Sequence, residues 1–195
     1  MRFRWKGRII FFATGNINKF NEARKVLAEF DLAVALIKVK ALEIQSNSLE
    51  EIAIASVTDA FSKCNLPIIV EDAGLFVDVL NGFPGPYAAY VYKTIGNAGL
   101  LRLLRDEKNR KARFRSVIAY KSAEVETPKL FGGESHGIIV SEERRGDRRS
   151  GFGFDPVFKP DESGKTFAEM SIEEKNLYSH RARALRSFAK WYRGF

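Results

Sequence analysis

The sequence contains one cysteine, two histidines and no long hydrophobic run. Because Cys64 has no partner for an internal disulfide, we expect a reducing, cytoplasmic location. One cysteine and two histidines are too few to build a Cys/His zinc site. The apolar runs, such as 9–13 and 67–70, are far shorter than the roughly 20 residues of a membrane-spanning helix. The sequence therefore predicts neither a membrane partner nor zinc coordination of this kind.

Three motifs that mark common enzyme classes are also missing. The chain has no P-loop (G-x-x-x-x-G-K-[ST]), no dinucleotide-binding G-x-G-x-x-G and no nucleophile elbow (G-x-S-x-G). Cys64 has no obvious partner histidine for nucleophilic catalysis. These absences argue against a P-loop nucleotidase and against a serine or cysteine hydrolase.

What the sequence does contain is the composition of a globular protein. Of its 195 residues, 45% are hydrophobic and 29% charged, which excludes disorder, collagen and coiled coil and predicts one domain over 1–195. The net charge of +8 is uneven, with about +1 on residues 1–100 and about +7 on residues 101–195. This asymmetry indicates an anionic partner, and nucleic acid, a phosphorylated small molecule and an acidic surface all fit it.

The hydrophobic periodicity predicts an α/β fold with a mixed sheet and flanking helices. The first half alternates apolar strands with segments of helical period, with strands over 8–13, 32–39 and 67–70 and helices over 18–30 and 48–64. A short helix and three antiparallel strands follow, over 98–106, 113–120, 128–133 and 136–140. Loops are expected at 81–86 and 142–153, and the last part is helical from the Ser171 capping box onward. A βαβ pattern before an antiparallel section is typical of a mixed sheet.

The strongest local signal for chemistry is the segment 13–19, between the first strand and the first helix. Unpaired backbone N–H groups and the positive end of the helix dipole make such a junction a natural seat for phosphate. Thr14 and Asn16 add side-chain donors, and Lys19 adds a full charge one turn into the helix. The alternative is an ordinary strand-to-helix turn with Asn16 or Asn18 as its N-cap.

Acidic residues follow the third strand, where Gly74 lets the chain turn away. Ligand sites of α/β sheets lie at the carboxyl ends of strands, so Glu71 and Asp72 are candidates for acidic catalysis. Mg²⁺ is held by one or two carboxylates together with phosphate oxygens and waters, and Glu43 is a plausible second ligand. Alternatively, these carboxylates cap turns or pair with surface lysine and arginine.

A third candidate segment, 151–156, places Phe152, Phe154 and Asp155 among glycines. Aromatic rings beside bare backbone can stack on a base, and a carboxylate can accept from purine N–H groups. The alternative is a β-bulge with core phenylalanines. Near the next helix starts, Lys175, His180 and Arg181 could clamp phosphate or a base carbonyl, although a lone histidine such as His180 is more often a satisfied surface residue.

Two basic runs, 102–115 and 144–149, are the best candidates for binding nucleic acid. Neither is accompanied by a recognisable nucleic-acid-binding fold signature, so a solvated face or loop is the simpler reading. A nucleic-acid-binding module remains the alternative from another functional class, and it predicts binding that depends steeply on salt.

Taken together, these segments resemble the inosine triphosphate pyrophosphatase family. The matching pieces occur in the family's order and span most of the chain: ATGNINK (13–19), LEIQ (42–45), EDAGLFVDVLNGFPGPY (71–87), GFGFDP (151–156) and TFAEMSIEEKN with SHR (166–176 and 179–181). The resemblance implies a strongly twisted mixed sheet with helices, two lobes around a long central cleft, and a homodimer. It also implies Mg²⁺-dependent hydrolysis of inosine, deoxyinosine and xanthosine triphosphates to the monophosphate and pyrophosphate, with no stable nucleic-acid partner. A related pyrophosphatase with another base preference is the nearest alternative.

The resemblance assigns roles by motif position. Asp72 would bind the metal and orient or deprotonate the attacking water, with Glu43 as the second metal ligand. Phe152 would stack on the purine, Asp155 would accept its N1–H and Phe154 would close the pocket. The remaining substrate-binding positions are Thr14, Gly15, Asn16, Ile17, Asn18, Lys19, Ala73, Gly153, Lys175, His180 and Arg181.

The chain departs from the family pattern at several positions around these motifs. Ala73 stands where many members carry Ser or Thr. Ala55 and Ala89 occupy places where some relatives carry Lys, and Tyr90 a place where others carry Arg. Lys93 is a candidate to replace a lost positive charge.

Overall fold

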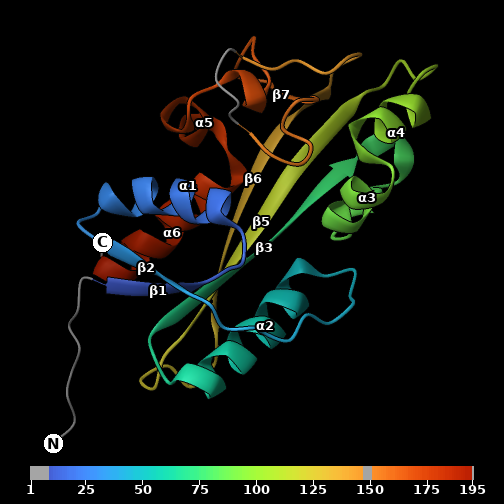
Figure 1. The fold of residues 1–195 in the computed structure, drawn as a ribbon. Coiled ribbons are helices and arrows are strands. Elements are labelled where there is room, and N and C mark those ends of the chain that lie inside the picture. The colour runs from blue at the N-terminus through green and yellow to red at the C-terminus, as the bar shows by residue number, and fades with distance from the viewer. Residues whose placement is uncertain (1–8, 147–150, 195) are drawn as a thin grey trace, which may run out of the picture.

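The structure, a computed structural model, describes residues 9–146 and 151–194; the predicted strand residue Arg8 and residues 147–149 of the basic run 144–149 lie outside them. A mixed sheet of seven strands runs through the described part (Figure 1). Its strands are β1 (Ile9–Ala13), β2 (Ala33–Ile37), β3 (Ile68–Val77), β4 (Pro84–Gly85), β5 (Lys111–Lys121), β6 (Lys129–Ile139) and β7 (Phe158–Pro160). The helices are α1 (Ile17–Ala28), α2 (Leu49–Cys64), α3 (Ala88–Thr94), α4 (Gly96–Leu103), α5 (Ile172–Tyr178) and α6 (His180–Arg193).

The strand order is β2-β1-β3-β5-β6-β7, with the short β4 paired to β3. β1 pairs with β2 and β3 in parallel, as βαβ units require, and the pairs from β3 through β5 and β6 to β7 are antiparallel. The predicted mixed α/β fold is therefore confirmed.

The first two strands and the first two helices form within two residues of their expected bounds. Asn16 is the N-cap of α1, and its Oδ1 accepts from the backbone N–H groups of Asn18 and Lys19. Ser48 caps α2 in the same way, accepting from the backbone N–H of Glu51 at 3.2 Å. Both caps satisfy N–H groups that a helix leaves unpaired at its start, which explains why these short motifs predict the helix positions well.

The third strand is longer than predicted. We expected it to end at Val70, with Gly74 turning the chain away, but β3 continues to Val77. The reason is its antiparallel ladder with β5, which pairs ten residues from Ile68 opposite Lys121 to Val77 opposite Ala112. Gly74 serves close packing instead, because a Cβ there would lie 2.5 Å from the carbonyl oxygen of Gly85. The acidic pair after Val70 therefore lies within a strand and not at its carboxyl end.

Three further expectations for the second half were wrong. The segments 128–133 and 136–140 form one continuous strand, β6, whose ladder with β5 runs without a break through Glu134 and Ser135 between them. The expected loop 81–86 contains β4, which pairs with Leu75 and Phe76. The helix expected at 98–106 begins and ends earlier, as α4, and the sequence did not predict α3 or β7.

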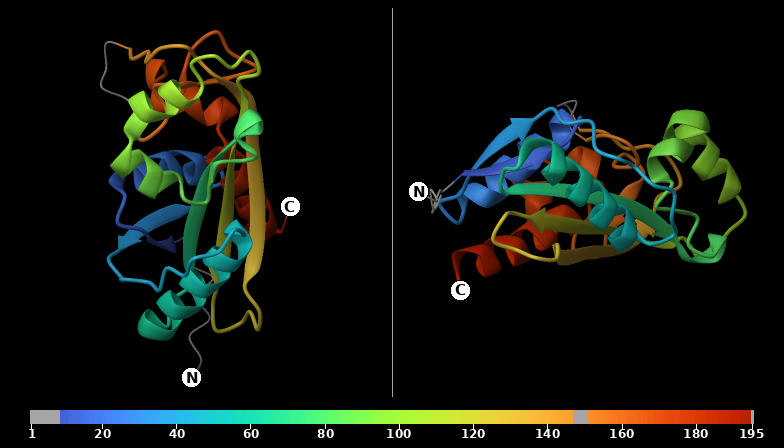
Figure 2. Two further views of the ribbon diagram at one scale, coloured as in Figure 1. Left: turned by 90° about the vertical axis from the view of Figure 1, so that its right-hand side faces the viewer. Right: turned by 90° about the horizontal axis from the view of Figure 1, so that it is seen from below.

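Helices cover both faces of the long strands (Figure 2). α6 lies on β5 and β6 with α1 beside it, while α2 lies on the other face against β3 and β5. Residues 116–120 of β5 are consequently all buried, which explains why the polar and apolar residues of this segment do not alternate.

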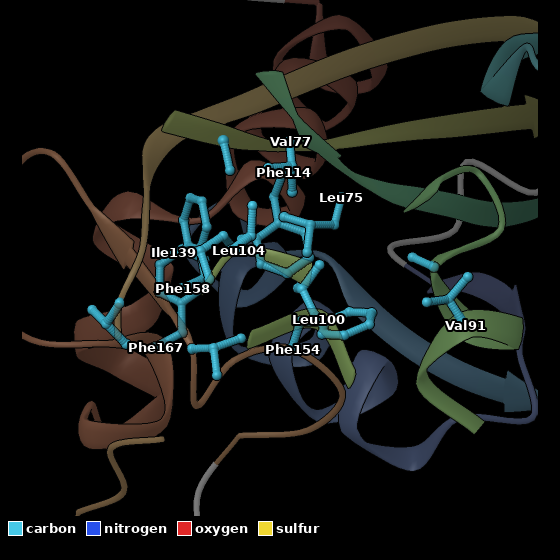
Figure 3. Packing of buried hydrophobic residues seen from close by; sticks show 14 of the residues in the cluster. Leu75, Val77, Val91, Leu100, Leu104, Phe114, Ile139, Phe154, Phe158 and Phe167 are labelled. Carbon is cyan, nitrogen blue, oxygen red and sulfur yellow. The ribbon is translucent and has the colours of Figure 1, made fainter. Parts of the chain in front are cut away.

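A hydrophobic cluster at the α3–α4 end of the sheet positions the segment 151–156 (Figure 3). In this cluster Phe154 packs with Leu75 and Leu100, and its ring meets that of Tyr92 edge-on at 5.5 Å. Phe154 thus anchors its segment to helices α3 and α4. No helix in the described ranges is long and apolar enough to cross a membrane.

Candidate active site

The loop between β1 and α1 is held by its own polar side chains. Besides the cap by Asn16, the Oγ1 of Thr14 accepts from the backbone N–H of Asn16 at 3.1 Å. These contacts use the side-chain acceptors and leave the Thr14 hydroxyl hydrogen and the Asn16 amide N–H groups as donors. A Cβ on Gly15 would meet no protein atom within 4 Å, so the backbone there is open to a ligand. The loop combines both alternatives of the sequence: it is a capped turn that also keeps donors exposed.

Glu71 is a buried junction between this loop and the C-terminal helices. Its Oε2 lies 2.8 Å from the Nζ of Lys19, and its Oε1 lies 3.1 Å from the Nε of Arg181 and accepts from the hydroxyl of Ser116 at 2.7 Å. Burial alone would raise the pKa of Glu71, but the charges of Arg181 and Lys19 outweigh it and hold that pKa far below its usual range. Glu71 therefore stays ionised and pairs with cations, the alternative raised for this acidic pair.

Asp72, the next residue, has the opposite environment. Successive strand residues point to opposite faces, so Asp72 faces the α2 side while Glu71 faces α6. Burial raises the pKa of Asp72 to about 6, assisted by the negative charges of Glu71 and Glu43 and opposed by the positive charge of Lys19. Its Oδ2 is buried without a hydrogen-bond partner. Such an orphaned carboxylate oxygen is available to a ligand or a reacting water.

Glu43 lies on an exposed segment whose position is fixed by α2. The backbone of Leu42 is held on both sides: its N–H donates to Asp59 Oδ2 at 2.8 Å, and its carbonyl accepts from the hydroxyl of Ser56 at 2.8 Å. The carboxylate of Glu43 is thereby kept close enough to Asp72 to affect its pKa.

These two carboxylates fit a divalent cation that is bound together with phosphate. In the ranges 9–146 and 151–194, no group of three or more His, Cys, Asp and Glu side chains could hold a metal ion. Mg²⁺ in nucleotide sites needs only one or two carboxylates, because phosphate oxygens and waters complete its shell. The orphaned Oδ2 of Asp72 and the neighbouring Glu43 form a donor set of this kind.

The segment 151–156 is held from beneath by a buried lysine. The Oδ2 of Asp155 accepts from the backbone N–H of Phe152 at 2.8 Å and from the Nζ of Lys175 at 2.6 Å. Lys175 also donates to Glu22 Oε1 at 2.8 Å and lies 4.8 Å from the ring centre of Phe152. Burial opposes the charge on Lys175, but the carboxylates of Asp155 and Glu22 outweigh it and raise its pKa. Lys175 therefore positions the segment, and no donor among the described residues reaches the Oδ1 of Asp155.

Arg181 and His180 complete this end of the site from the first turn of α6. The guanidinium of Arg181 is buried between Glu71 and Glu22, and its carbon lies 5.4 Å from the ring centre of Phe152. The two carboxylates outweigh burial and raise the pKa of Arg181, so it is always cationic. Burial and the charge of Arg181 lower the pKa of His180 well below its usual value, and its neutral ring stacks on that of Phe114 at 4.7 Å.

Most of the predicted site residues border one cavity of about 350 Å³. The predicted residues that line it are Asn16, Lys19, Asp72, Ala73, Phe152, Gly153, Phe154, Asp155, His180 and Arg181. Thr14, Gly15 and Glu43 line a second cavity of about 880 Å³ on the other side of the same loop. Ile17 and Asn18 border neither cavity and are exposed. The fold thus brings residues that are far apart in the sequence, from Asn16 to Arg181, to the wall of one cavity.

Sequence reasoning missed residues that hold this site together. Glu22, from the inward face of α1, binds both Lys175 and Arg181. The only sign of this role in the sequence is that Glu22 stands next to the apolar residues that form the buried face of the helix. Ser116 lies inside an apolar strand, and Tyr92 belongs to the unpredicted α3, so neither had a recognisable signal.

Some of the residues that depart from the family pattern lie at the candidate site, and others lie away from it. Ala73, Ala89 and Lys93 line the 350 Å³ cavity, and Lys93 has no ion-pair partner in the described part of the chain. Tyr90 is 70% exposed, and neither it nor Ala55 borders the 350 Å³ cavity or its 880 Å³ neighbour. Lys93 is therefore placed to supply positive charge to the cavity.

Three arginines of the basic run 102–115, at positions 110, 113 and 115, form contacts inside the protein, while its other basic residues are exposed. Arg110 donates to the backbone carbonyls of Ile139 at 2.7 Å and Val140 at 2.9 Å. Arg115 forms ion pairs with Glu50 and Glu134. These arginines stabilise the sheet surface and are not free for a nucleic acid.

The N-terminus of α6 lies unusually close to β6. A Cβ on Gly133 would be 2.2 Å from the carbonyl oxygen of His180 and 2.5 Å from the backbone nitrogen of Ala184. Only glycine permits this approach, which sets the position of His180 and Arg181. The neighbouring Gly132 has open space where a Cβ would lie.

We expect Gly133→Ala to destabilise the protein by about 1–3 kcal/mol, because the added methyl group forces α6 away from β6. Denaturant unfolding measures this loss. Gly132→Ala, one residue earlier on the same strand, is the matched control and should change the free energy of unfolding by much less. Equal effects of the two substitutions would show that the close approach has no special importance.

Asp72→Asn should stabilise the protein at pH 7.5 in metal-free buffer. A pKa of about 6 in place of the ordinary 3.8 means that folding disfavours the charged form by about 3 kcal/mol. This cost is fully present above about pH 6 and absent below about pH 4, where the carboxyl is protonated in both states. Denaturant unfolding at pH 7.5 and 4, with exposed Asp106→Asn as control, should show a gain of about 1–3 kcal/mol only for Asp72→Asn at pH 7.5; no gain there contradicts the assignment.

Comparison with known proteins gives the chain its family. The Ham1 family model matches residues 10–191. A dITP/XTP pyrophosphatase from Methanopyrus kandleri is 49% identical over 94% of this chain and 96% of its own length, and one from Thermococcus kodakarensis is 49% identical over 92% and 95%. The solved structure of a HAM1 protein from Coxiella burnetii superposes with a TM-score of 0.81 at 29% identity, covering 96% of this chain and 99% of that chain. The resemblance drawn from the motifs is confirmed, and the chain belongs to the Ham1 family.

Proposed function

We propose that this protein, acting as one domain in the cytoplasm, hydrolyses inosine, deoxyinosine and xanthosine triphosphates to the monophosphate and pyrophosphate with Mg²⁺. The observation that carries the proposal is the single cavity in which Phe152 and Asp155 face Asp72 and Lys19. One end offers an aromatic ring, a carboxylate and an arginine, which suit a purine, and the other offers a lysine, an amide and an orphaned carboxylate, which suit phosphate. The dITP/XTP pyrophosphatase names of relatives at 49% identity support this substrate class.

The chemistry follows from the two ends of the cavity. Water attacks the α-phosphorus, and Asp72, whose pKa of about 6 leaves it ionised yet basic near neutral pH, accepts the proton. The bond from the α-phosphorus to the bridging oxygen breaks, and pyrophosphate leaves with the electron pair. Lys19, held 2.8 Å from Glu71 and 21% exposed, is placed to stabilise the growing charge. When bound, Mg²⁺ held by Asp72 and Glu43 would add to this charge neutralisation.

Base selection rests on Asp155 and Arg181. Both donors that reach Asp155 from the described residues bind its Oδ2, so its Oδ1 is left to accept N1–H of a 6-oxo purine. The cationic Arg181 beside the Phe152 ring is a suitable donor for the O6 atom. Adenine has a lone pair at N1 and an amino group at C6, so both protein groups would lack a partner, at a cost of about 1–3 kcal/mol each.

Hydrolysis of a nucleotide panel with Mg²⁺ tests this function, with pyrophosphate and orthophosphate detected separately. Inosine and xanthosine triphosphates should yield pyrophosphate, while adenosine and cytidine triphosphates, which lack an N1–H beside a 6-oxo group, should yield little. Asp72→Asn should nearly abolish turnover while leaving nucleotide binding measurable. Orthophosphate as the only product, or near-normal activity of Asp72→Asn, would overturn the mechanism.

We also propose that the protein forms a homodimer through the exposed aromatic face beside α3. Phe83, Tyr87 and Tyr90 are 41%, 40% and 70% exposed, although α3 turns other residues toward the cavity. Clustered exposed aromatic side chains are typical of interfaces.

Sedimentation velocity should therefore find a dimer that Tyr90→Asp converts to a monomer, because a buried unpaired charge opposes association. Leu177→Asp, which also replaces an exposed apolar residue (63%) but lies on α5, should leave the dimer intact. A monomeric wild-type protein, or equal effects of both substitutions, would contradict this interface.

A further inference from the structure

The second cavity, of about 880 Å³, lies on the far side of the β1–α1 loop from the base-binding end. It is bordered by Thr14 and Gly15 of that loop, by the segment 38–43 and by the C-terminal half of α2. Lys38 and Lys40 line it and are exposed, and their side-chain ammonium groups have no hydrogen-bond or ion-pair partner among the described residues. Of the residues that line this cavity, the proposed reaction involves only Thr14, Gly15 and Glu43.

The wall that carries these lysines is firmly attached to α2. The Nζ of Lys63 donates to the carbonyl oxygen of Lys40 at 2.8 Å and to Asp59 Oδ2 at 2.6 Å. Asp59 Oδ2 also accepts from the backbone N–H of Leu42 at 2.8 Å. Asp59 and Lys63 neutralise each other, so the charges left to a ligand are those of Lys38 and Lys40 against Glu43. The segment 38–43 is therefore held in place by hydrogen bonds to α2, and the cavity that it lines has a net positive charge.

Its size exceeds what the proposed substrate needs. With the α-phosphate at Asp72, the second and third phosphates reach the loop at Thr14 and Gly15, where the large cavity begins. A space of roughly 300–1,000 Å³ holds a whole small-molecule ligand, whereas two phosphate groups fill only a small part of it. The unfilled part of the 880 Å³ cavity, with Lys38 and Lys40 in its lining, therefore lies beyond the position of the third phosphate.

We infer that this cavity is a subsite for phosphate groups beyond the third, so that the enzyme also accepts purine nucleoside 5′-tetraphosphates. The inference rests on the proposed function and extends its substrate class. Water adds to the α-phosphorus of the tetraphosphate, and its proton passes to Asp72. The α–β bridging bond breaks, and inorganic triphosphate leaves with the electron pair, so the products are the monophosphate and triphosphate. Lys38 and Lys40 bind the distal phosphates as point charges.

The test compares inosine 5′-tetraphosphate with inosine triphosphate on the wild-type enzyme and on the double variant K38A/K40A. We expect kcat/KM for the tetraphosphate to fall about tenfold in the variant and that for the triphosphate to fall by less than about threefold, because only the longer chain reaches both lysines. K108A/K190A removes two exposed lysines far from the cavity and is the charge-matched control, with no expected change in this ratio.

Calorimetric titration of inorganic triphosphate in metal-free buffer gives a readout that is independent of turnover. We expect binding to the wild-type protein and the control, and about tenfold weaker binding to K38A/K40A. Equal binding to all three proteins, equal losses for the two nucleotides, or a tetraphosphate that is not hydrolysed while the triphosphate is, would each overturn the subsite. Failure to hydrolyse both nucleotides would instead refute the proposed function, and the titration would still decide whether the subsite binds polyphosphate.

Discussion

The site depends on two buried carboxylates that hold three cations. Glu71 binds Lys19 and Arg181, and Glu22 binds Arg181 and Lys175. Charges removed from water are costly unless they are paired, and breaking a buried pair typically costs about 3–5 kcal/mol. This chain of alternating charges therefore fixes Lys19, Arg181 and the Lys175 that supports Asp155 in one arrangement before any ligand arrives.

The same network separates the roles of two adjacent acids. Glu71 and Asp72 are neighbours on β3, but one faces three donors and the other faces a cavity with an unpaired oxygen. Their pKa values consequently move in opposite directions, downward for Glu71 and upward for Asp72. Divergent pKa values in neighbouring groups are how proteins assign a structural and a catalytic task to the same side-chain chemistry.

The long antiparallel strands supply the geometry that the charges require. The ten-residue ladder of β3 with β5 brings Ser116 to Glu71, and the contact of β6 with α6 at Gly133 brings Arg181 to the same carboxylate. On the other face, α2 places Glu43 through the backbone of Leu42. Each functional group is thus positioned by an element that is itself part of the core.

By itself, the sequence determined the features that depend on neighbouring residues: the caps at Asn16 and Ser48, the first strands and helices, and the motifs that carry the family resemblance. Caps and periodicity act within one or two turns, so a local pattern is enough to predict them. The tertiary structure alone decided that β3 runs through the acidic pair, that Lys175 supports Asp155, and that Glu22 joins residues 153 and 159 positions away. Those outcomes depend on strand pairing and on the burial of charge, and both exist only once distant segments have come together.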